Sequence, residues 1–212
     1  MYTVFIKSQN GFPITDWACD AYLGFRDTQI SIEFFEDIET VPVSTRNIIV
    51  SYIEDVNRYL VKLGLSPKMN LNIPEELMGY AGRKIWYCTM GELCAKREYP
   101  IFLKPNGKAK EFIAGVLTTP STYDYLETLD PNLLVMASEV VEFVSEYRGY
   151  VYDRKLQGLY WYLGDFTVFP DTTVIEQAIS DYKSQPAGYS IDFGVTKDGR
   201  TLLIECNDGF SL

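Results

Sequence analysis

The chain of 212 residues contains no histidine. This absence excludes Ser-His-Asp and Cys-His catalysis, zinc sites with imidazole ligands and an imidazole general base. Any chemistry must therefore rest on carboxylates, lysine, arginine, tyrosine or a bound ion. Positive charge is also scarce, because 19 Lys and Arg stand against 29 Asp and Glu, for a net charge of −10. That balance argues against nonspecific binding to a nucleic-acid backbone, which depends on Lys and Arg.

Cysteines are few, and long apolar runs are absent. The four cysteines are scattered and include no C-x-x-C pair, which excludes a secreted disulfide framework and gives no sign of zinc. They are Cys19, Cys88, Cys94 and Cys206. No stretch is long and apolar enough to span a bilayer, and the first residues, MYTVFIKSQNG, lack the regions of a signal peptide. We therefore expect reduced thiols and a cytoplasmic protein.

Apolar residues make up 47% of the chain, enough to bury a sizeable core. Prolines bracket the polar stretch 67–74, which indicates a linker between a small N-terminal α/β domain, residues 1–72, and a second domain, residues 73–212. Most strands predicted in the second domain are short and linked by turns, which favours a mainly antiparallel α+β arrangement. The first domain is predicted to hold strands at 2–6 and 30–35, a helix at 16–25 and a partly helical stretch at 47–63.

The last two dozen residues, YSIDFGVTKDGRTLLIECNDGFSL, predict a β-hairpin. Asp198-Gly199 suits a two-residue turn, because both residues tolerate positive φ and apolar-rich runs flank them. Since side chains alternate across a strand, this turn fixes which residues share a face. The apolar face is predicted to pair Ile191 with Cys206, Phe193 with Ile204 and Val195 with Leu202.

The opposite face of this hairpin carries paired acids. Asp192 is predicted to face Glu205 with Cβ atoms roughly 5 Å apart, an arrangement that repels unless something positive lies nearby. Asn207, paired with Ser190, adds a neutral oxygen, and Gly194 pairs with Leu203. Magnesium takes few protein oxygens and fills its octahedron with water and phosphate, so this face favours a metal site over a solvated acidic surface.

Other residues suit a ligand less specifically. In IFLKPNGKAK, Lys104 lies beside a Gly-containing loop that can hold phosphate oxygens, although a solvated turn has the same pattern and the spacing of a Walker loop is missing. Arg148 shares a predicted strand face with Tyr150, where a stacked or ion-paired structural arginine is the simpler explanation. Glu139 and Glu142 lie in an otherwise apolar stretch, where a buried carboxylate is costly unless a ribose, an adenine edge or backbone amides supply donors.

Taken in order, these segments resemble the ATP-grasp superfamily, ligases that activate a carboxylate as an acyl phosphate with ATP and magnesium. PIFLKP resembles the strand of the phosphate-binding lysine, SEVVEF the adenine hinge, and EYRGYV the Asp-x-Arg strand. SIDFG followed by LIECNDG resembles the metal-binding Asp, Glu and Asn. The resemblance covers about residues 80–212 and implies two α+β subdomains that grip a nucleotide, preceded by a small α/β domain.

The resemblance also implies a role for each candidate. Asp192, Glu205 and Asn207 would hold one or two magnesium ions, or manganese, and Lys104 and Arg148 would act as catalytic residues that stabilise phosphate charge. A further set would contact ATP: Lys84, Lys104 and Lys110 its phosphates, Glu139 and the backbone near Val141 its adenine, and Glu142 its ribose. Lys84 and Lys104 lie only 20 positions apart, and the chain ends five residues after Asn207. We therefore expect a compact, divergent member whose last loop is short or cut off.

The sequence thus predicts an ATP- and magnesium-dependent ligase that joins a carboxylate to an amine, each a small molecule or a peptide of unknown identity. Such chemistry needs no histidine, because positioning and charge neutralisation carry it. Two alternatives stay open. One is a non-catalytic nucleotide-binding or interaction protein that keeps the fold; the other is a metal-dependent nuclease that uses the same carboxylates, which the acidic charge balance disfavours.

Overall fold

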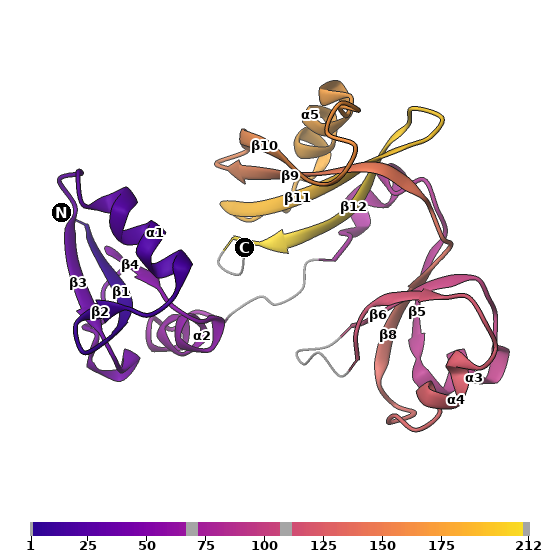
Figure 1. Ribbon diagram of the computed structural model, residues 1–212, viewed down its shortest axis with the longest axis horizontal. Helices are drawn as coiled ribbons and strands as arrows, with labels where there is room; N and C mark the ends of the chain where they lie inside the picture. The colour runs from indigo at the N-terminus through magenta and orange to yellow at the C-terminus, as the bar shows by residue number, and fades with distance from the viewer. Residues whose placement is uncertain (1, 67–71, 107–111, 210–212) are drawn as a thin grey trace. The chain divides into compact units, whose positions relative to one another are not determined.

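The computed structural model describes residues 2–66, 72–106 and 112–209, and the chain divides into two compact units, the first ending at residue 68 (Figure 1). The predicted linker at 67–74 lies largely outside the described residues, and the predicted boundary at 72/73 stays a prediction. Among the described residues no helix is both long and apolar enough to cross a membrane.

The first unit is built around a parallel sheet. Its central strand pairs with one parallel strand on each side and with a short antiparallel strand that follows it. These strands are β1 (Thr3–Gln9), β2 (Phe12–Pro13), β3 (Ser31–Phe35) and β4 (Asn47–Val50). Val4 and Ile6 pack in one core cluster with Ala18 of α1 (Asp16–Phe25), whereas Phe5 packs with Tyr59 of α2 (Ile53–Lys62). The predicted strands and the helix at 16–25 are confirmed, and the stretch 47–63 divides into a strand and a helix.

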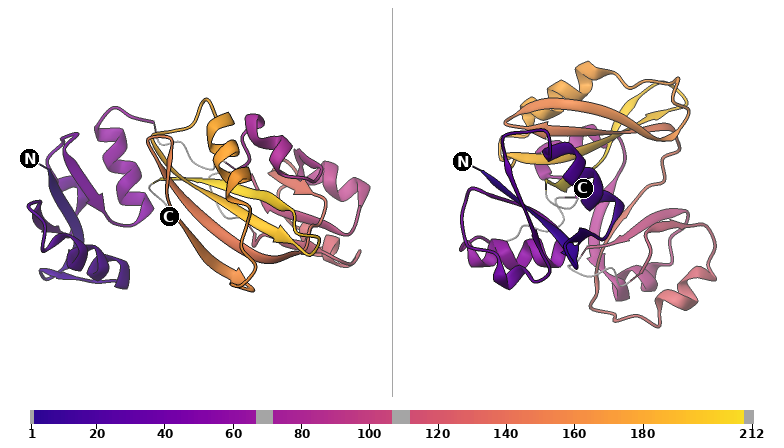
Figure 2. Two further views of the ribbon diagram at one scale, coloured as in Figure 1. Left: turned by 90° about the horizontal axis from the view of Figure 1, so that it is seen from above. Right: turned by 60° about the vertical axis from the view of Figure 1, so that its left-hand side comes forward.

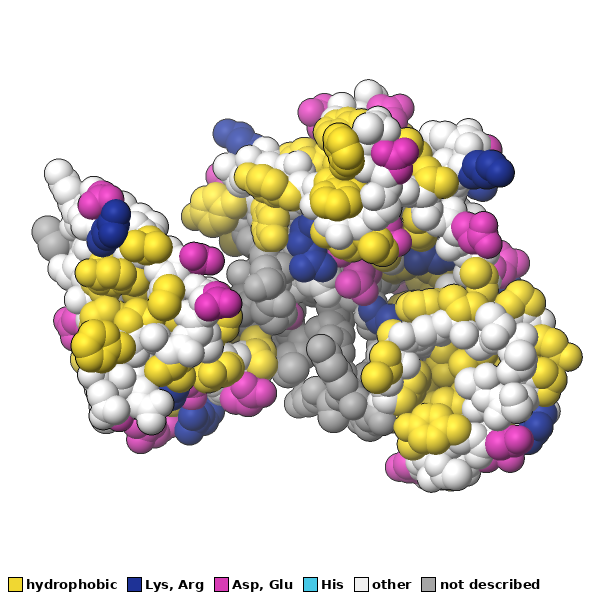
Figure 3. All heavy atoms as spheres, in the orientation of Figure 1, with side chains coloured by type: hydrophobic (Ala, Val, Ile, Leu, Met, Phe, Trp, Pro, Cys, Tyr) yellow, Lys and Arg dark blue, Asp and Glu magenta, His cyan; other side chains and the backbone are white. Residues whose placement is uncertain are grey.

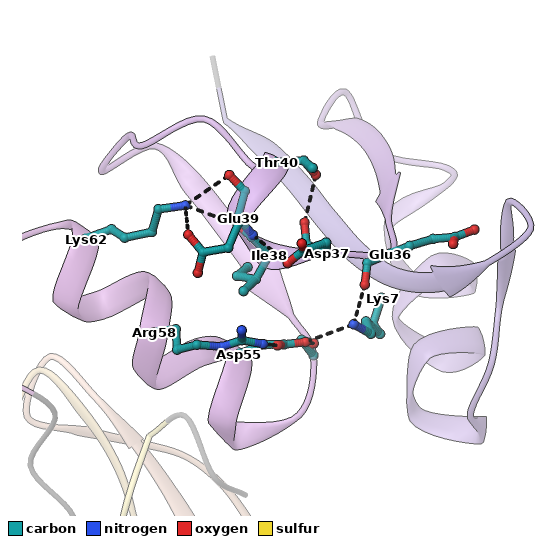
Figure 4. Close-up of polar contacts among 10 residues, drawn as sticks. Lys7, Glu36, Asp37, Ile38, Glu39, Thr40, Asp55, Arg58 and Lys62 are labelled. Atoms are coloured by element: carbon teal, nitrogen blue, oxygen red, sulfur yellow. Dashed lines mark hydrogen bonds and ion pairs between the residues drawn. The ribbon is translucent and has the colours of Figure 1, made fainter.

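A charged cluster lies at the end of β1 in this unit (Figure 4). Asp55 is 4% exposed, and its carboxylate accepts a hydrogen bond from Ser51 Oγ at 2.5 Å. Lys7 Nζ lies 3.2 Å from Asp55 Oδ2 and donates to the carbonyl of Glu36 at 2.6 Å, while Arg58 pairs with the other Asp55 oxygen. Three donors therefore surround one buried carboxylate.

The second unit contains two antiparallel sheets. The β5–β8 sheet has the strand order β5-β8-β6-β7, and its core includes Met90 and Tyr123 from two short helices. Its elements are β5 (Ile85–Thr89), α3 (Met90–Lys96), β6 (Ile101–Pro105), β7 (Gly115–Leu117), α4 (Thr122–Leu126) and β8 (Leu134–Ser138). The predicted antiparallel α+β arrangement is confirmed here.

The β9–β12 sheet has the order β10-β9-β11-β12, and α5 covers one of its faces (Figure 2). Its elements are η2 (Glu75–Tyr80), β9 (Phe143–Tyr152), β10 (Lys155–Gly164), α5 (Thr172–Asp181), β11 (Gly188–Thr196) and β12 (Thr201–Asp208). On the α5 side, Ile175 and Ile179 pack against Ile191, Phe193 and Leu203 in one core cluster. The opposite side of the sheet is therefore left for polar side chains.

The β11–β12 hairpin differs from its prediction in two ways. Its loop has three residues, Lys197–Gly199, because Thr196 N–H bonds the carbonyl of Arg200 at 2.9 Å and Gly199 takes φ +82°. A β-bulge then shifts the register, so Phe193 faces Leu203 and the predicted pairs of Phe193, Gly194 and Val195 are wrong. Beyond the bulge the predicted register returns: Ile191 faces Cys206, Asp192 faces Glu205 and Ser190 faces Asn207.

Candidate functional site

The polar side of the β9–β12 sheet gathers residues from three neighbouring strands. Arg148 on β9 lies opposite Asp192 on β11, which in turn lies opposite Glu205 on β12. Antiparallel pairing places directly opposed residues on one face, so the three side chains meet there. Asn207, two residues beyond Glu205, follows on the same face. The predicted metal ligands and the predicted arginine are thus brought together.

Arg148 and Asp192 form a bidentate ion pair. Arg148 Nε donates to Asp192 Oδ1 at 2.9 Å and Nη2 to Oδ2 at 2.8 Å. The Asp192 side chain is 2% exposed and that of Arg148 is 30% exposed, so the carboxylate is buried beneath its partner. Burial raises the pKa of Asp192, and the hydrogen bonds and charge of Arg148 oppose this rise without cancelling it. Asp192 therefore carries an under-compensated negative charge.

Lys104 of β6 reaches the neighbouring acid. Lys104 Nζ lies 2.7 Å from Glu205 Oε2, and Asn207 donates from Nδ2 to Glu205 Oε1 at 3.0 Å. Burial raises the pKa of Glu205, but the charge and hydrogen bond of Lys104, with the Asn207 amide, bring it below its usual value. Glu205 consequently stays ionised, and one ion pair joins the two sheets of the second unit.

Aromatic side chains of β10 complete this face. The Tyr162 hydroxyl donates to Glu146 Oε2 at 2.8 Å, and the Arg148 guanidinium carbon lies 5.8 Å from the Tyr162 ring centroid. Arg148 is thus held between a carboxylate and an aromatic ring. Beside it, Tyr150 and Tyr160 line a shallow depression in an edge-to-face pair with ring centroids 5.8 Å apart. Exposed hydrophobic side chains continue over this part of the unit (Figure 3).

The donor set of this face fits a hard cation. Asp192 and Glu205 offer carboxylate oxygens, and Asn207 donates through its nitrogen, which keeps its amide oxygen for a ligand. The hydroxyl of Ser190, one pleat from Asp192, is buried without a hydrogen-bond partner among the described residues. The described part of the chain contains no group of three His, Cys, Asp or Glu residues placed to hold a metal. Water and phosphate oxygens would therefore have to complete the coordination of magnesium here.

The predicted nucleotide contacts lie at the junction of the two sheets. The Lys84 N–H donates to Glu139 Oε2 at 2.9 Å, and the Glu139 N–H donates to the Lys84 carbonyl at 3.0 Å. Val141 and Glu142 line a shallow depression together with the tip of the β11–β12 hairpin, including Lys197. Lys110 lies outside the described residues.

The expected burial of Glu139 and Glu142 is wrong. Both residues are exposed, because the buried part of this apolar stretch is β8, and the chain leaves the sheet after Ser138. Their carboxylates therefore face no desolvation cost, and ligand donors are not needed to offset one.

Sequence reasoning missed one residue that contacts the strand of Glu205. Arg83, in the segment between η2 and β5, donates to the carbonyls of Leu203 and Ile204. Its position in GRKIW, directly before Lys84, gives no sign of this contact, because the partner is 120 residues away along the chain. Only the folded arrangement brings it to β12.

Solved structures with the same arrangement of elements define the class of fold. D-alanine–D-alanine ligase from Bacillus anthracis matches 97% of this chain and 86% of its own, with a TM-score of 0.62 and 13% identity. A RimK domain ATP-grasp protein from Sphaerobacter thermophilus DSM 20745 matches 98% and 91%, with a TM-score of 0.61 and 14% identity. The ATP-grasp ligase PsnB, complexed with a minimal precursor, matches 99% and 90%, with a TM-score of 0.58 and 13% identity. At these identities the likeness establishes an ATP-grasp fold.

The sequence itself identifies the family. Residues 80–212 match the model of an ATP-grasp domain, the second family of its clade, and the chain belongs to that ATP-grasp family. A sequence search of curated proteins finds no match. The predicted resemblance to the ATP-grasp superfamily and the predicted fold class are confirmed.

Proposed function

We propose that this protein is an ATP- and magnesium-dependent ligase that activates a carboxylate as an acyl phosphate for attack by an amine. One observation carries the proposal: two cations and two carboxylates, contributed by four strands of two sheets, converge on one polar surface. The family assignment supports ATP as the substrate, and the names of the similar structures, D-alanine–D-alanine ligase and PsnB among them, support ligation.

The residues have distinct proposed roles. Asp192, Glu205 and Asn207 would hold magnesium, which when bound supplies positive charge to the β- and γ-phosphate oxygens. Lys104, at the end of β6, is placed to bind the transferred phosphate from the side of the β5–β8 sheet. Arg148 would stabilise negative charge on the γ-phosphate or the acyl phosphate, because its bidentate fork matches paired oxygens. Positioning and charge neutralisation then suffice for phosphoryl transfer without a histidine.

The remaining predicted contacts place ATP along the junction of the two sheets. Glu139 and Val141 would contact adenine, Glu142 would contact ribose, and Lys84, and Lys110 in the loop after β6, would assist the phosphates. In this arrangement the phosphates would meet the polar side of the β9–β12 sheet, and the substrates would approach beside Tyr150 and Tyr160. The identities of the carboxylate and the amine stay open to a library screen.

The test measures ADP formation with magnesium across a library of carboxylates and amines. Lys104→Met, Asp192→Asn and Glu205→Gln are each expected to lower turnover by at least about 100-fold, the cost of removing one electrostatic contact from a phosphoryl-transfer site. Lys96→Met in α3 and Asp153→Asn in the β9–β10 turn are matched exposed controls that should keep wild-type turnover. Wild-type rates in all three site variants would refute the proposal.

One observation favours a second candidate, a nucleotide-binding protein without turnover. Asp192 and Glu205 already have cationic partners, so this face is balanced by the chain's own charges. Calorimetry distinguishes the two: heat of ATP binding that Lys104→Met abolishes, with no ADP formed for any substrate pair, would support binding alone.

A further inference from the structure

We propose that Arg83 is a positioning residue, whose guanidinium holds strand β12 in the bulged register that places Glu205 opposite Asp192. The register claim concerns the fold of this chain, and only its consequence for turnover rests on the proposed function.

The contacts of Arg83 converge on the bulge. Arg83 Nη1 donates to the Leu203 carbonyl at 2.7 Å and to the Ala81 carbonyl at 3.1 Å, while Nη2 donates to the Ile204 carbonyl at 3.1 Å. Successive carbonyls of a regular strand point to opposite edges, so two consecutive carbonyls that meet one side chain mark a distorted strand. A planar guanidinium, with parallel donors in a fixed fork, suits such a pair.

The bulge decides where Glu205 points. Phe193 faces Leu203 and Asp192 faces Glu205, so Ile204 is the extra residue on β12. Without it, the register on the hairpin side of the bulge would continue, placing Ile204 opposite Asp192 and Glu205 opposite Ile191. Ile191 is fully buried in the core under α5. A one-residue slip therefore turns Glu205 from the polar face into the core.

The neighbouring glycine supports the same contact. Gly82 takes φ +59°, and a Cβ built on it would lie 2.6 Å from the Leu202 side chain. The backbone of residues 82–83 thus meets β12 at Leu202, Leu203 and Ile204 in succession, which requires glycine at the first position. Directly after Arg83, Lys84 pairs with Glu139 beside β8, so the same segment links both sheets.

The experiment compares wild type with Arg83→Lys and Arg83→Met, and uses Arg97→Lys, an exposed ion pair of the same unit, as the matched control. Backbone NMR contacts report the register directly, either between Asp192 and Glu205 or between Asp192 and Ile204. Mass-spectrometric mapping of alkylated thiols supplies a second readout, because Cys206 is 1% exposed and a slip would move it to the opposite face.

Arg83→Met is expected to weaken the Asp192–Glu205 contacts, to reveal Asp192–Ile204 contacts and to speed Cys206 alkylation by about tenfold or more, since buried carbonyls lose charged donors. Arg83→Lys, which keeps the charge without the fork, should show the same changes in part, and it decides the case if Arg83→Met does not fold. Arg97→Lys should change neither readout.

A loss of stability with unchanged Asp192–Glu205 contacts and unchanged Cys206 labelling would overturn the inference, because it would show a merely structural arginine. The two proposals fail separately. Absence of ADP formation in the wild type contradicts the ligase and leaves the register readouts intact, whereas a preserved register with lost turnover contradicts only the positioning role.

Discussion

Each unit buries an aspartate against an arginine and a lysine nearby, yet the two sites differ in compensation. In the first unit, Ser51, Lys7 and Arg58 all donate to Asp55, and these hydrogen bonds, with the charge of Lys7, outweigh burial and lower its pKa. In the second unit, only Arg148 pairs with Asp192, burial dominates, and the pKa of Asp192 is raised.

The difference separates a structural ion pair from a functional one. A buried carboxylate with all its donors lowers the free energy of the folded state, whereas an under-compensated one is tolerated where a ligand completes it. The second lysine of the Asp192 site, Lys104, binds Glu205 instead, so two carboxylates share two cations over a larger surface. We interpret this spread of charge as readiness to bind another cation.

The sharpest break of the comparison is one substitution made twice. Asp55→Asn should lower the free energy of unfolding by about 3 kcal/mol, because it leaves the half-buried Lys7 without its counter-charge. Asp192→Asn should change it by less than about 1 kcal/mol, because Arg148 reaches water and the raised pKa means that ionised Asp192 already costs stability. Denaturation with amide hydrogen exchange, which assigns each loss to a unit, makes the measurement. Equal losses would show that the two aspartates serve the same purpose.

Lys104→Met removes compensation from the second site alone. The lowered pKa of Glu205 stabilises the wild type above its usual value of 4.5, and this contribution is lost as the pH falls through the folded pKa. Without Lys104, burial becomes the largest influence and the pKa should rise, so ionised Glu205 would then oppose folding at neutral pH. A ¹³C titration of the Glu205 carboxyl gives the answer, with Asp55 as the internal reference. A Glu205 pKa that stays low would mean that Asn207 and Arg148 suffice.

The smallest expected effect concerns the ring above Arg148. Tyr162→Phe removes the hydrogen bond to Glu146 and should cost about 1 kcal/mol of stability, while the ring still covers the guanidinium. Tyr162→Ala should also speed exchange of the Arg148 Nε–H, because the bidentate pair loses its cover. NMR exchange rates, with Tyr160→Phe as the control on the same strand, measure this. Equal rates in Tyr162→Ala and wild type would show that Asp192 alone holds Arg148.

The hairpin shows how far the sequence predicts the site. Alternation and an Asp-Gly turn predicted that Asp192 faces Glu205, and the structure agrees. The predicted loop was one residue too short, however, and the bulge at Ile204 restores the register that the longer loop had shifted. Local turn preferences cannot reveal this compensation, because the carbonyls at the bulge bond Arg83, which comes from a distant part of the chain.

Long-range pairing explains the rest of what the sequence left open. Arg148 was expected among tyrosines, and Tyr162 does lie against it, but its pairing with Asp192 follows from β9 lying beside β11. Likewise, Lys104 was chosen for its loop, and nothing in that loop indicates Glu205, 101 residues later. Strand order, which no local pattern states, creates both ion pairs.

One bridge on the rim of the β9–β12 sheet bears on where this chain can be cut. The Asn72 carbonyl accepts the Cys206 N–H at 2.6 Å, and Asn72 Nδ2 donates to Asn106 at 2.8 Å. Strand β12 is otherwise an edge strand of its sheet, and unpaired edges invite association between molecules. A shortened protein beginning at residue 73, the predicted boundary, would lose this bridge between Glu205 and Asn207. One beginning a few residues earlier would keep its edge protected.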